Sequence, residues 1–193
     1  MIAAIIQARM GSNRFPGKVL KDLNGKPVIQ YIIENMEKLK SKGHIDEYYF
    51  AIPNTNENLE LVEYLKTKNV NVYTGSDSDV LDRFYQCAKE TKIDTIVRIC
   101  ADTPFTEPWQ ISQQIENFNK TKKFSYGNGA WVFSYEELED SWKNGHNPED
   151  REHVVTRMYN AIDYPEDLEK LRNFSMCKRS NCIGYKRIGI TIL

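Results

Sequence analysis

The chain has 193 residues, of which 40% are hydrophobic and 27% are charged, a balance typical of a globular protein and not of a disordered one. The 26 Lys and Arg residues against 27 Asp and Glu residues give a formal net charge of −1. A net charge near zero argues against a general nucleic-acid binder, which needs a surplus of positive charge to neutralise phosphates.

Short apolar runs rich in β-branched residues alternate with segments of helical period, a pattern typical of an α/β domain with a largely parallel sheet. The pattern predicts strands over residues 2–6, 48–52, 70–73 and 95–100, and Asn128-Gly129 predicts a tight turn before an apolar run at 131–133. It predicts helices over residues 28–39, 61–65, 80–88, 108–118 and 154–159, with Pro165 opening a last short one. Because no repeat or linker interrupts the chain, we expect a single domain over residues 1–193, with a tail of unclear role from about residue 172.

No segment is typical of export or of a membrane span. The apolar run from Met1 to Ile6 is too short for a spanning helix, and no basic region precedes it. The four cysteines lack both CxxC spacing and paired His ligands, which argues against a zinc site. We therefore expect reduced thiols, a cytoplasmic location and no membrane partner.

The charges are unevenly distributed along the chain. Residues 1–42 hold eight basic and three acidic residues, a net charge of +5. Residues 43–169 hold 12 basic and 24 acidic residues, a net charge of −12. Residues 170–193 hold six basic residues and no acidic one. Solvated faces are the ordinary explanation for such a layout, and the alternative is a site that combines polyanion binding with a metal.

The loop over residues 8–18 follows the first strand, and ligands of α/β sheets bind beyond the carboxyl ends of the strands. Gly11 and Gly17 permit backbone conformations that bring N–H groups up to an anion, and Arg9, Arg14 and Lys18 add three cations. A triphosphate needs this combination of donors and charges. The spacing excludes a P-loop, and the GxGxxG fingerprint is absent, so the remaining alternative is a basic surface turn.

Five ordered segments resemble the sugar cytidylyltransferases, whose members activate 3-deoxy-manno-octulosonate and acylneuraminates with CTP, and above all the branch named for spore-coat polysaccharide biosynthesis. They are QARMGSNRFPGKVL with NGKP, GS with DVLDRFY, RICADTPFTEP, REHV and DYPEDL. The resemblance implies a three-layer α/β/α Rossmann-like nucleotide-diphospho-sugar transferase fold with a mostly parallel mixed sheet. It also implies an enzyme that converts an acidic sugar to its CMP derivative and releases pyrophosphate. Such a product is used in surface polysaccharide or glycan biosynthesis.

The resemblance also implies roles for individual residues. Catalytic roles fall on Arg9, Lys18 and Asp102. Residues expected to bind the nucleotide, CTP, are Gln7, Ala8, Arg9, Gly11, Ser12, Arg14, Lys18, Asp82 and Arg83. The cofactor is Mg²⁺, with Asp102 and Asp163 as its ligands. Residues expected to contact the small sugar acceptor are Thr103, Arg151, Glu152 and His153.

Without the resemblance, each acidic position has an ordinary structural explanation. Asp102 follows a strand and suits a hard cation, but aspartate also forms turns and caps helices. Asp163 precedes a Pro-started helix, and Asp82 with Arg83 is a plausible helix-start pair. The group over residues 151–153 is expected to begin a helix, where a surface ion pair would account for it.

Two regions, 124–133 and 159–163, are shorter than the family pattern leads one to expect. In relatives these regions shape the acceptor pocket and contribute to dimer contacts, so a homodimer remains an open expectation. A trimmed, non-catalytic nucleotide-binding relative that acts as a partner or regulatory protein is therefore an alternative. A transferase for another nucleotide or a non-sugar acceptor is a third possibility.

Overall fold

The computed structural model describes residues 1–12 and 15–161. Several expectations lie outside the described residues: the positions of Arg14 and Asp163, the helix opened by Pro165 and the tail from about residue 172. Residues Met1–Ala161 form one compact unit, which carries all the elements below. Among the described residues, no helix is long and apolar enough to cross a membrane.

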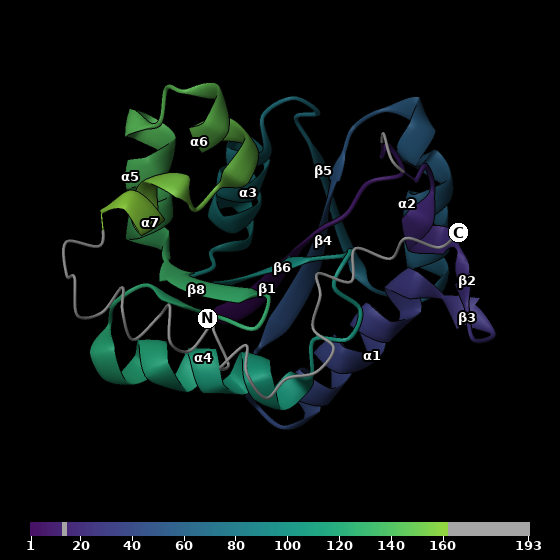
Figure 1. Cartoon of the computed structure of the whole chain (residues 1–193), viewed down its shortest axis with the longest axis horizontal. Coiled ribbons are helices and arrows are strands. Elements are labelled where there is room, and N and C mark those ends of the chain that lie inside the picture. Colours follow the sequence, from purple (N-terminus) through teal and green to yellow (C-terminus); the bar gives the residue numbers. More distant parts are fainter. Residues whose placement is uncertain (13–14, 162–193) are drawn as a thin grey trace, which may run out of the picture. The chain divides into compact units, whose positions relative to one another are not determined.

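Six strands form the main sheet (Figure 1). In spatial order they are β5 (Asn71–Gly75), β4 (Glu47–Pro53), β1 (Ile2–Gln7), β6 (Thr95–Cys100), β8 (Ala130–Ser134) and β7 (Ser125–Gly127). The first four run parallel, whereas β8 is antiparallel to β6 and β7 is antiparallel to β8. The expected mostly parallel mixed sheet is therefore confirmed, with an antiparallel hairpin at one edge.

Helices cover both faces of this sheet (Figure 1). One face carries α1 (Val28–Ser41), α2 (Leu59–Thr67) and α4 (Pro108–Thr121). The other carries α3 (Val80–Thr91), α5 (Tyr135–Asn144), α6 (Pro148–His153) and α7 (Thr156–Asn160). Strand β1 is buried on both sides, because Ala4 and Ile6 join the first core and Ala3 and Ile5 join the second. The three-layer α/β/α architecture is thus confirmed.

The predicted strands at 2–6, 48–52, 70–73 and 95–100 correspond to β1, β4, β5 and β6. The predicted turn is also present: Asn128 and Gly129 have φ of 52° and 83° and join β7 to β8. A second Asn-Gly turn, at Asn24 and Gly25, joins β2 (Asp22–Leu23) to β3 (Lys26–Pro27) in a separate two-stranded sheet.

The predicted helix over 154–159 is present as α7 (Thr156–Asn160), but it begins two residues later than the sequence pattern predicts. Helix α6 ends at His153, Val154 adopts φ 55° and ψ −51°, and a new helix α7 begins at Thr156. The reason is tertiary: α6 packs against α3 while α7 packs against α5, so one straight helix cannot make both contacts. Arg151, Glu152 and His153 consequently end a helix, whereas the sequence pattern placed them at the start of one.

Helix α5 was absent from the sequence-based expectations because its sequence, YEELEDSWKN, is dominated by polar residues and buries few apolar ones. A local signal was nevertheless present. Ser134 Oγ accepts a hydrogen bond from the Glu137 N–H at 3.2 Å, and Glu137 Oε2 accepts one from the Ser134 N–H at 2.7 Å. This reciprocal capping box defines where α5 begins.

We expect Ser134→Ala to lower the free energy of unfolding by about 1 kcal/mol, because the variant leaves an N-terminal N–H of α5 without its acceptor. A thermal melt followed by circular dichroism measures the loss, with Glu136→Gln, an exposed change in the same turn, as the matched control. Equal melting temperatures for Ser134→Ala and the control would contradict the capping role.

Candidate functional site

A cavity of about 280 Å³ lies where β1 and β6 end. Its lining consists of Gln7, Ala8, Arg9, Gly11, Ser12, Lys18, Val19, Cys100, Ala101 and Asp102. The two segments meet because β1 and β6 are adjacent and parallel: Gln7 pairs with Cys100, and the Ala101 N–H donates to the Gln7 carbonyl at 3.0 Å. The structure therefore brings together seven predicted site residues, Gln7, Ala8, Arg9, Gly11, Ser12, Lys18 and Asp102.

The loop after β1 contributes Arg9, Gly11 and Ser12 to the lining of the cavity, and a backbone hydrogen bond joins its two ends. The Gly17 N–H donates to the Met10 carbonyl at 2.8 Å, and Gly17 has φ 69°, in the left-handed region that favours glycine. The short 3-10 helix η1 (Lys18–Leu20) follows directly and buries Val19 in the core. Lys18 is therefore the first residue of a helix that is anchored in the core through Val19, and this anchoring sets the position of the Lys18 backbone.

A second contact ties this loop to a distant part of the chain. Asn58, in the 3-10 helix η2 (Asn56–Asn58), is 1% exposed and accepts a hydrogen bond from the Met10 N–H at 2.8 Å. Its Nδ2 donates to Thr55 Oγ1 at 2.7 Å. Asn58 was not among the predicted site residues, because nothing in its local sequence indicates a partner 48 positions away.

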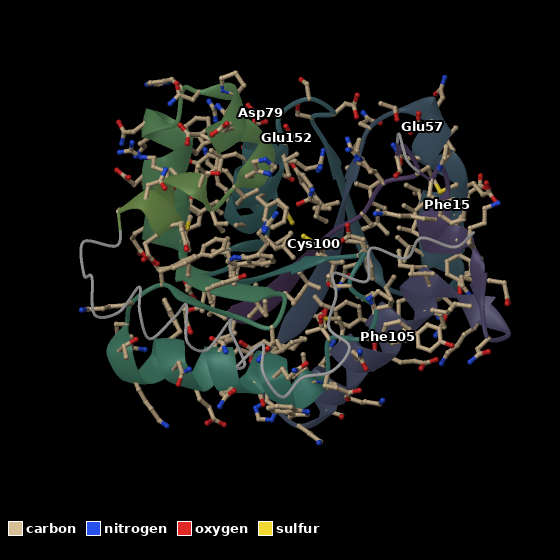
Figure 2. All side chains as sticks on the ribbon, in the orientation of Figure 1. Phe15, Glu57, Asp79, Cys100, Phe105 and Glu152 are labelled. Atoms are coloured by element: carbon tan, nitrogen blue, oxygen red, sulfur yellow. The ribbon has the colours of Figure 1, made fainter. Side chains whose placement is uncertain are left out.

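Gly11 serves a different purpose from Gly17. A Cβ built on Gly11 would overlap the carboxylate of Glu57, which precedes Asn58. Figure 2 shows Glu57 and Phe15 on the same side of Cys100 in the view, with Asp79 and Glu152 on the other side. A side chain at position 11 would therefore displace the exposed Glu57 carboxylate, and Gly11 itself lines the cavity.

The two charged predicted residues from opposite walls form an ion pair. Lys18 Nζ lies 3.1 Å from Asp102 Oδ2, and the two side chains are 32% and 50% exposed. Such an accessible pair contributes little to stability, so a ligand can separate it at small cost. Cation and carboxylate are therefore both available to a bound molecule.

The surroundings of Asp102 suit one kind of Mg²⁺ site and not another. Within the described residues, no three His, Cys, Asp or Glu side chains are grouped as a closed metal site would need. Mg²⁺ that binds together with phosphates needs only one or two carboxylates, because phosphate oxygens and water complete its shell. The half-exposed Asp102 carboxylate, facing the cavity, fits that requirement.

Cys100 also lines the cavity, and sequence reasoning did not select it. Burial raises the pKa of its thiol, the neighbouring Arg98 lowers it, and Asp102 raises it again. The net direction is upward, so the thiolate form of Cys100 is less favoured than that of an exposed cysteine.

The remaining predicted residues lie elsewhere. Asp82 accepts hydrogen bonds from Trp142 Nε1 at 2.8 Å and from Gln86 Nε2 at 3.0 Å. Arg83 is 1% exposed and donates to the Ser76 carbonyl, and its burial lowers its pKa to about 10. Both residues lie in α3, outside the cavity lining.

The expected sugar contacts are likewise outside the lining. Thr103 follows Asp102, and its Oγ1 donates to the Cys100 carbonyl at 2.8 Å, so it closes the turn after β6. Arg151 Nε lies 3.5 Å from Asp79 Oδ2, whereas Glu152 and His153 are exposed at the end of α6.

Comparison with known proteins places this geometry in context. A family model described as cytidylyltransferase matches residues 3–173. An uncharacterized protein of Methanocaldococcus jannaschii is 38% identical over 165 residues, covering 82% of this chain and 67% of that protein. The spore coat polysaccharide biosynthesis protein SpsF of Bacillus subtilis is 28% identical over 127 residues, covering 65% and 53%. The 3-deoxy-manno-octulosonate cytidylyltransferase of Trichlorobacter lovleyi is 35% identical over 118 residues, covering 61% and 44%. The aligned regions thus span 44% to 67% of these relatives' own lengths.

Solved structures share the fold. A cytidylyltransferase from Leptospira borgpetersenii has a TM-score of 0.70 at 24% identity, over 90% of this chain and 73% of that one. The CMP:2-keto-3-deoxy-manno-octonic acid synthetase complexed with CTP has a TM-score of 0.66 at 16% identity, over 89% and 97%. A Mycobacterium tuberculosis protein solved with manganese has a TM-score of 0.54 at 15% identity, over 76% and 82%.

The family match extends from β1 past the last described helix and includes every residue that lines the cavity. The resemblance seen in the sequence, the family match and the shared fold of the solved structures agree. The chain belongs to the cytidylyltransferase family.

Proposed function

We propose that this protein is a CTP-dependent nucleotidyltransferase that activates a sugar as its CMP derivative and releases pyrophosphate. The observation that carries the proposal is the cavity in which the loop after β1 faces Asp102 across the ends of two adjacent strands. Because the chain spans only part of its relatives, the activity of the whole protein, its substrates and its partners belong to the proposal.

The loop supplies what a triphosphate requires. Arg9 and Lys18 provide positive charge at the cavity, and the backbone at Gly11 and Ser12 provides N–H donors. Arg14 belongs to the same loop in the sequence, and we propose it as a third cation. On phosphate binding, Lys18 would exchange its contact with Asp102 for a phosphate oxygen, which leaves the carboxylate free.

Asp102 is the residue proposed to hold Mg²⁺, with Asp163 as a second carboxylate. A divalent cation supplies neutralisation of phosphate charge when bound. The manganese complex of a structural neighbour supports a divalent cation in this fold.

Nucleotidyl transfer depends on the enzyme's positioning of the two substrates more than on a covalent bond to the enzyme. The acceptor hydroxyl oxygen would form a bond to the α-phosphorus, the bond to the β-phosphate oxygen would break in line, and the hydroxyl proton would pass to solvent. Arg9 and Lys18 would hold the leaving pyrophosphate.

An acidic sugar is the proposed acceptor, because a curated relative is named as a 3-deoxy-manno-octulosonate cytidylyltransferase. The similarity to the spore coat polysaccharide biosynthesis protein supports a role in polysaccharide or glycan synthesis. Four residues stay proposed sugar contacts: Thr103, Arg151, Glu152 and His153. Asp82 and Arg83 stay proposed nucleotide contacts. A cytoplasmic location and a homodimer complete the proposal.

A non-catalytic, nucleotide-binding role is the second candidate. The shortened regions 124–133 and 159–163 favour it, whereas the cavity with Lys18 and Asp102 in contact favours catalysis. A pyrophosphate-release screen with four nucleoside triphosphates against acidic and neutral sugars decides between them. Release with CTP and an acidic sugar supports the enzyme, and CTP binding without release for any sugar supports the second candidate.

We expect Asp102→Asn to reduce pyrophosphate release on the order of 100-fold or more, because the variant removes the carboxylate at the cavity while keeping its shape. A coupled pyrophosphate assay measures the loss, and a melting curve establishes that the fold is retained. Glu116→Gln, an exposed change on α4, is the control. Near-normal release by Asp102→Asn would overturn the metal assignment.

We expect Asn58→Ala to weaken CTP binding about tenfold, because the Met10 N–H loses its acceptor and the loop loses a part-buried hydrogen bond that is worth ~1 kcal/mol. Isothermal titration calorimetry gives the affinity, and the exposed Asn56→Ala in the same 3-10 helix is the matched control. A less stable Asn58→Ala protein that binds CTP as tightly as the parent would show that this contact supports the fold alone.

A further inference from the structure

Arg98 is a buried arginine in β6 that the function proposed above does not use. The sheet register places Arg98 beside Ile5 and Gln7 beside Cys100, so Arg98 and Gln7 are diagonal neighbours on the same face. On its other side, Arg98 pairs directly with Trp131 of β8. Arg98 therefore lies between the cavity strand β1 and the edge hairpin.

Two contacts hold the Arg98 guanidinium, and a third supports the aromatic ring that it lies on. Its central carbon is 4.5 Å from the centroid of the Trp131 ring, so the aromatic side chain covers one face of the charged group. Trp131 in turn stacks on Tyr126 of β7, with centroids 5.3 Å apart and planes 25° apart. Finally, Arg98 Nη2 donates a hydrogen bond to Gln7 Oε1 at 3.1 Å.

Burying the Arg98 guanidinium in this way costs free energy of folding. Arg98 is only 6% exposed, and no carboxylate of the described residues forms an ion pair with it. Its Nε is buried and has no hydrogen-bond partner in the described part of the chain. A buried, unpaired cation with an unsatisfied donor is unfavourable for folding, so its presence beside a cavity residue points to a role there.

The consequence for Gln7 follows from the chemistry of an amide. A glutamine side chain can turn either its oxygen or its NH₂ group toward a neighbour. Because Arg98 only donates, it binds the oxygen, and the Nε2 hydrogens of Gln7 are left for another acceptor. Gln7 lines the cavity, and its Nε2 has no partner among the residues that the structure describes.

We propose that Arg98 is a positioning residue that fixes the Gln7 amide, so that Gln7 Nε2 donates a hydrogen bond to an anionic oxygen of a substrate bound in the cavity. The inference rests on the function proposed above. The positive charge behind the amide strengthens it as a donor and favours an anionic acceptor atom. That oxygen belongs either to a phosphate of the nucleotide or to the carboxylate of an acidic sugar, and the two sources are separable by experiment.

The test is a double-mutant cycle with Gln7→Ala, Arg98→Met and the two combined. The dissociation constant for CTP without acceptor reports on a phosphate contact. The KM for 3-deoxy-manno-octulosonate at saturating CTP reports on a carboxylate contact. We expect each single variant to raise one of these two constants about tenfold, and both single variants to raise the same one. The double variant should be within twofold of Gln7→Ala, because Arg98 acts through Gln7.

Gln7→Glu tests the donor itself. The glutamate keeps an oxygen for Arg98, so the fold is retained, but it offers no N–H and repels an anion; we expect a larger loss than for Gln7→Ala. Arg157→Met, on α7 and paired with Asp140, is the matched arginine control. Should Arg98→Met melt at a much lower temperature than the parent, Arg98→Gln, which removes the charge but keeps a polar side chain, replaces it in the cycle. Arg98→Lys, which keeps a cation and a donor for Gln7 Oε1, should then stay within twofold of the parent.

Losses that add in the double variant, or single variants within twofold of the parent in both quantities, would overturn the inference. The parent protein is measured first, so the two levels of proposal stay distinct. If the parent fails to bind CTP, the proposed function fails and takes this inference with it. If the parent binds CTP and releases pyrophosphate while the Gln7 and Arg98 variants behave as the parent does, only the role of Arg98 is refuted.

Discussion

The parallel pairing of β1 with β6 is the constraint on which the site depends. It aligns Gln7 with Cys100, so the loop that leaves β1 and the turn that leaves β6 begin side by side. Every lining residue of the cavity comes from these two exits or from η1, which the first of them enters. Because both strands lie in the middle of the sheet and are covered on both faces, this alignment is held by two hydrophobic cores.

Long-range polar contacts fix the loop after β1, most of which lies outside the two hydrophobic cores. Asn58 holds Met10 from the connection that follows β4, and the Gly17 N–H closes the loop on the Met10 carbonyl. Lys18 and Asp102, 84 positions apart, meet across the cavity. In its described residues, the backbone of the loop is thus held by hydrogen bonds while the side chains of Arg9 and Lys18 stay accessible, an arrangement that suits a site whose ligand is a flexible polyanion.

The sequence pattern predicted the regular elements where local signals agreed with the tertiary structure. Apolar strands and helices with a full inner face, such as α1 and α4, were located within a few residues. The pattern failed at α5, where few apolar residues are buried, and at Val154, where the packing of α6 and α7 on different neighbours breaks an apparently continuous helix. Both failures arise because helix packing partners are not encoded in the local period.

The sequence alone determined the order of the strands along the chain, the basic and glycine-containing loop after the first of them, and the acidic residue after the fourth. These features are local, since each depends on residue types within a few positions of one another. Only the tertiary structure decided that Asn58 holds the loop, that Cys100 and Ala101 line the cavity, and that Arg98 binds Gln7 from 91 positions away. The physical reason is the register of the sheet, which is set by the packing of both faces at once and which no single segment of the chain specifies.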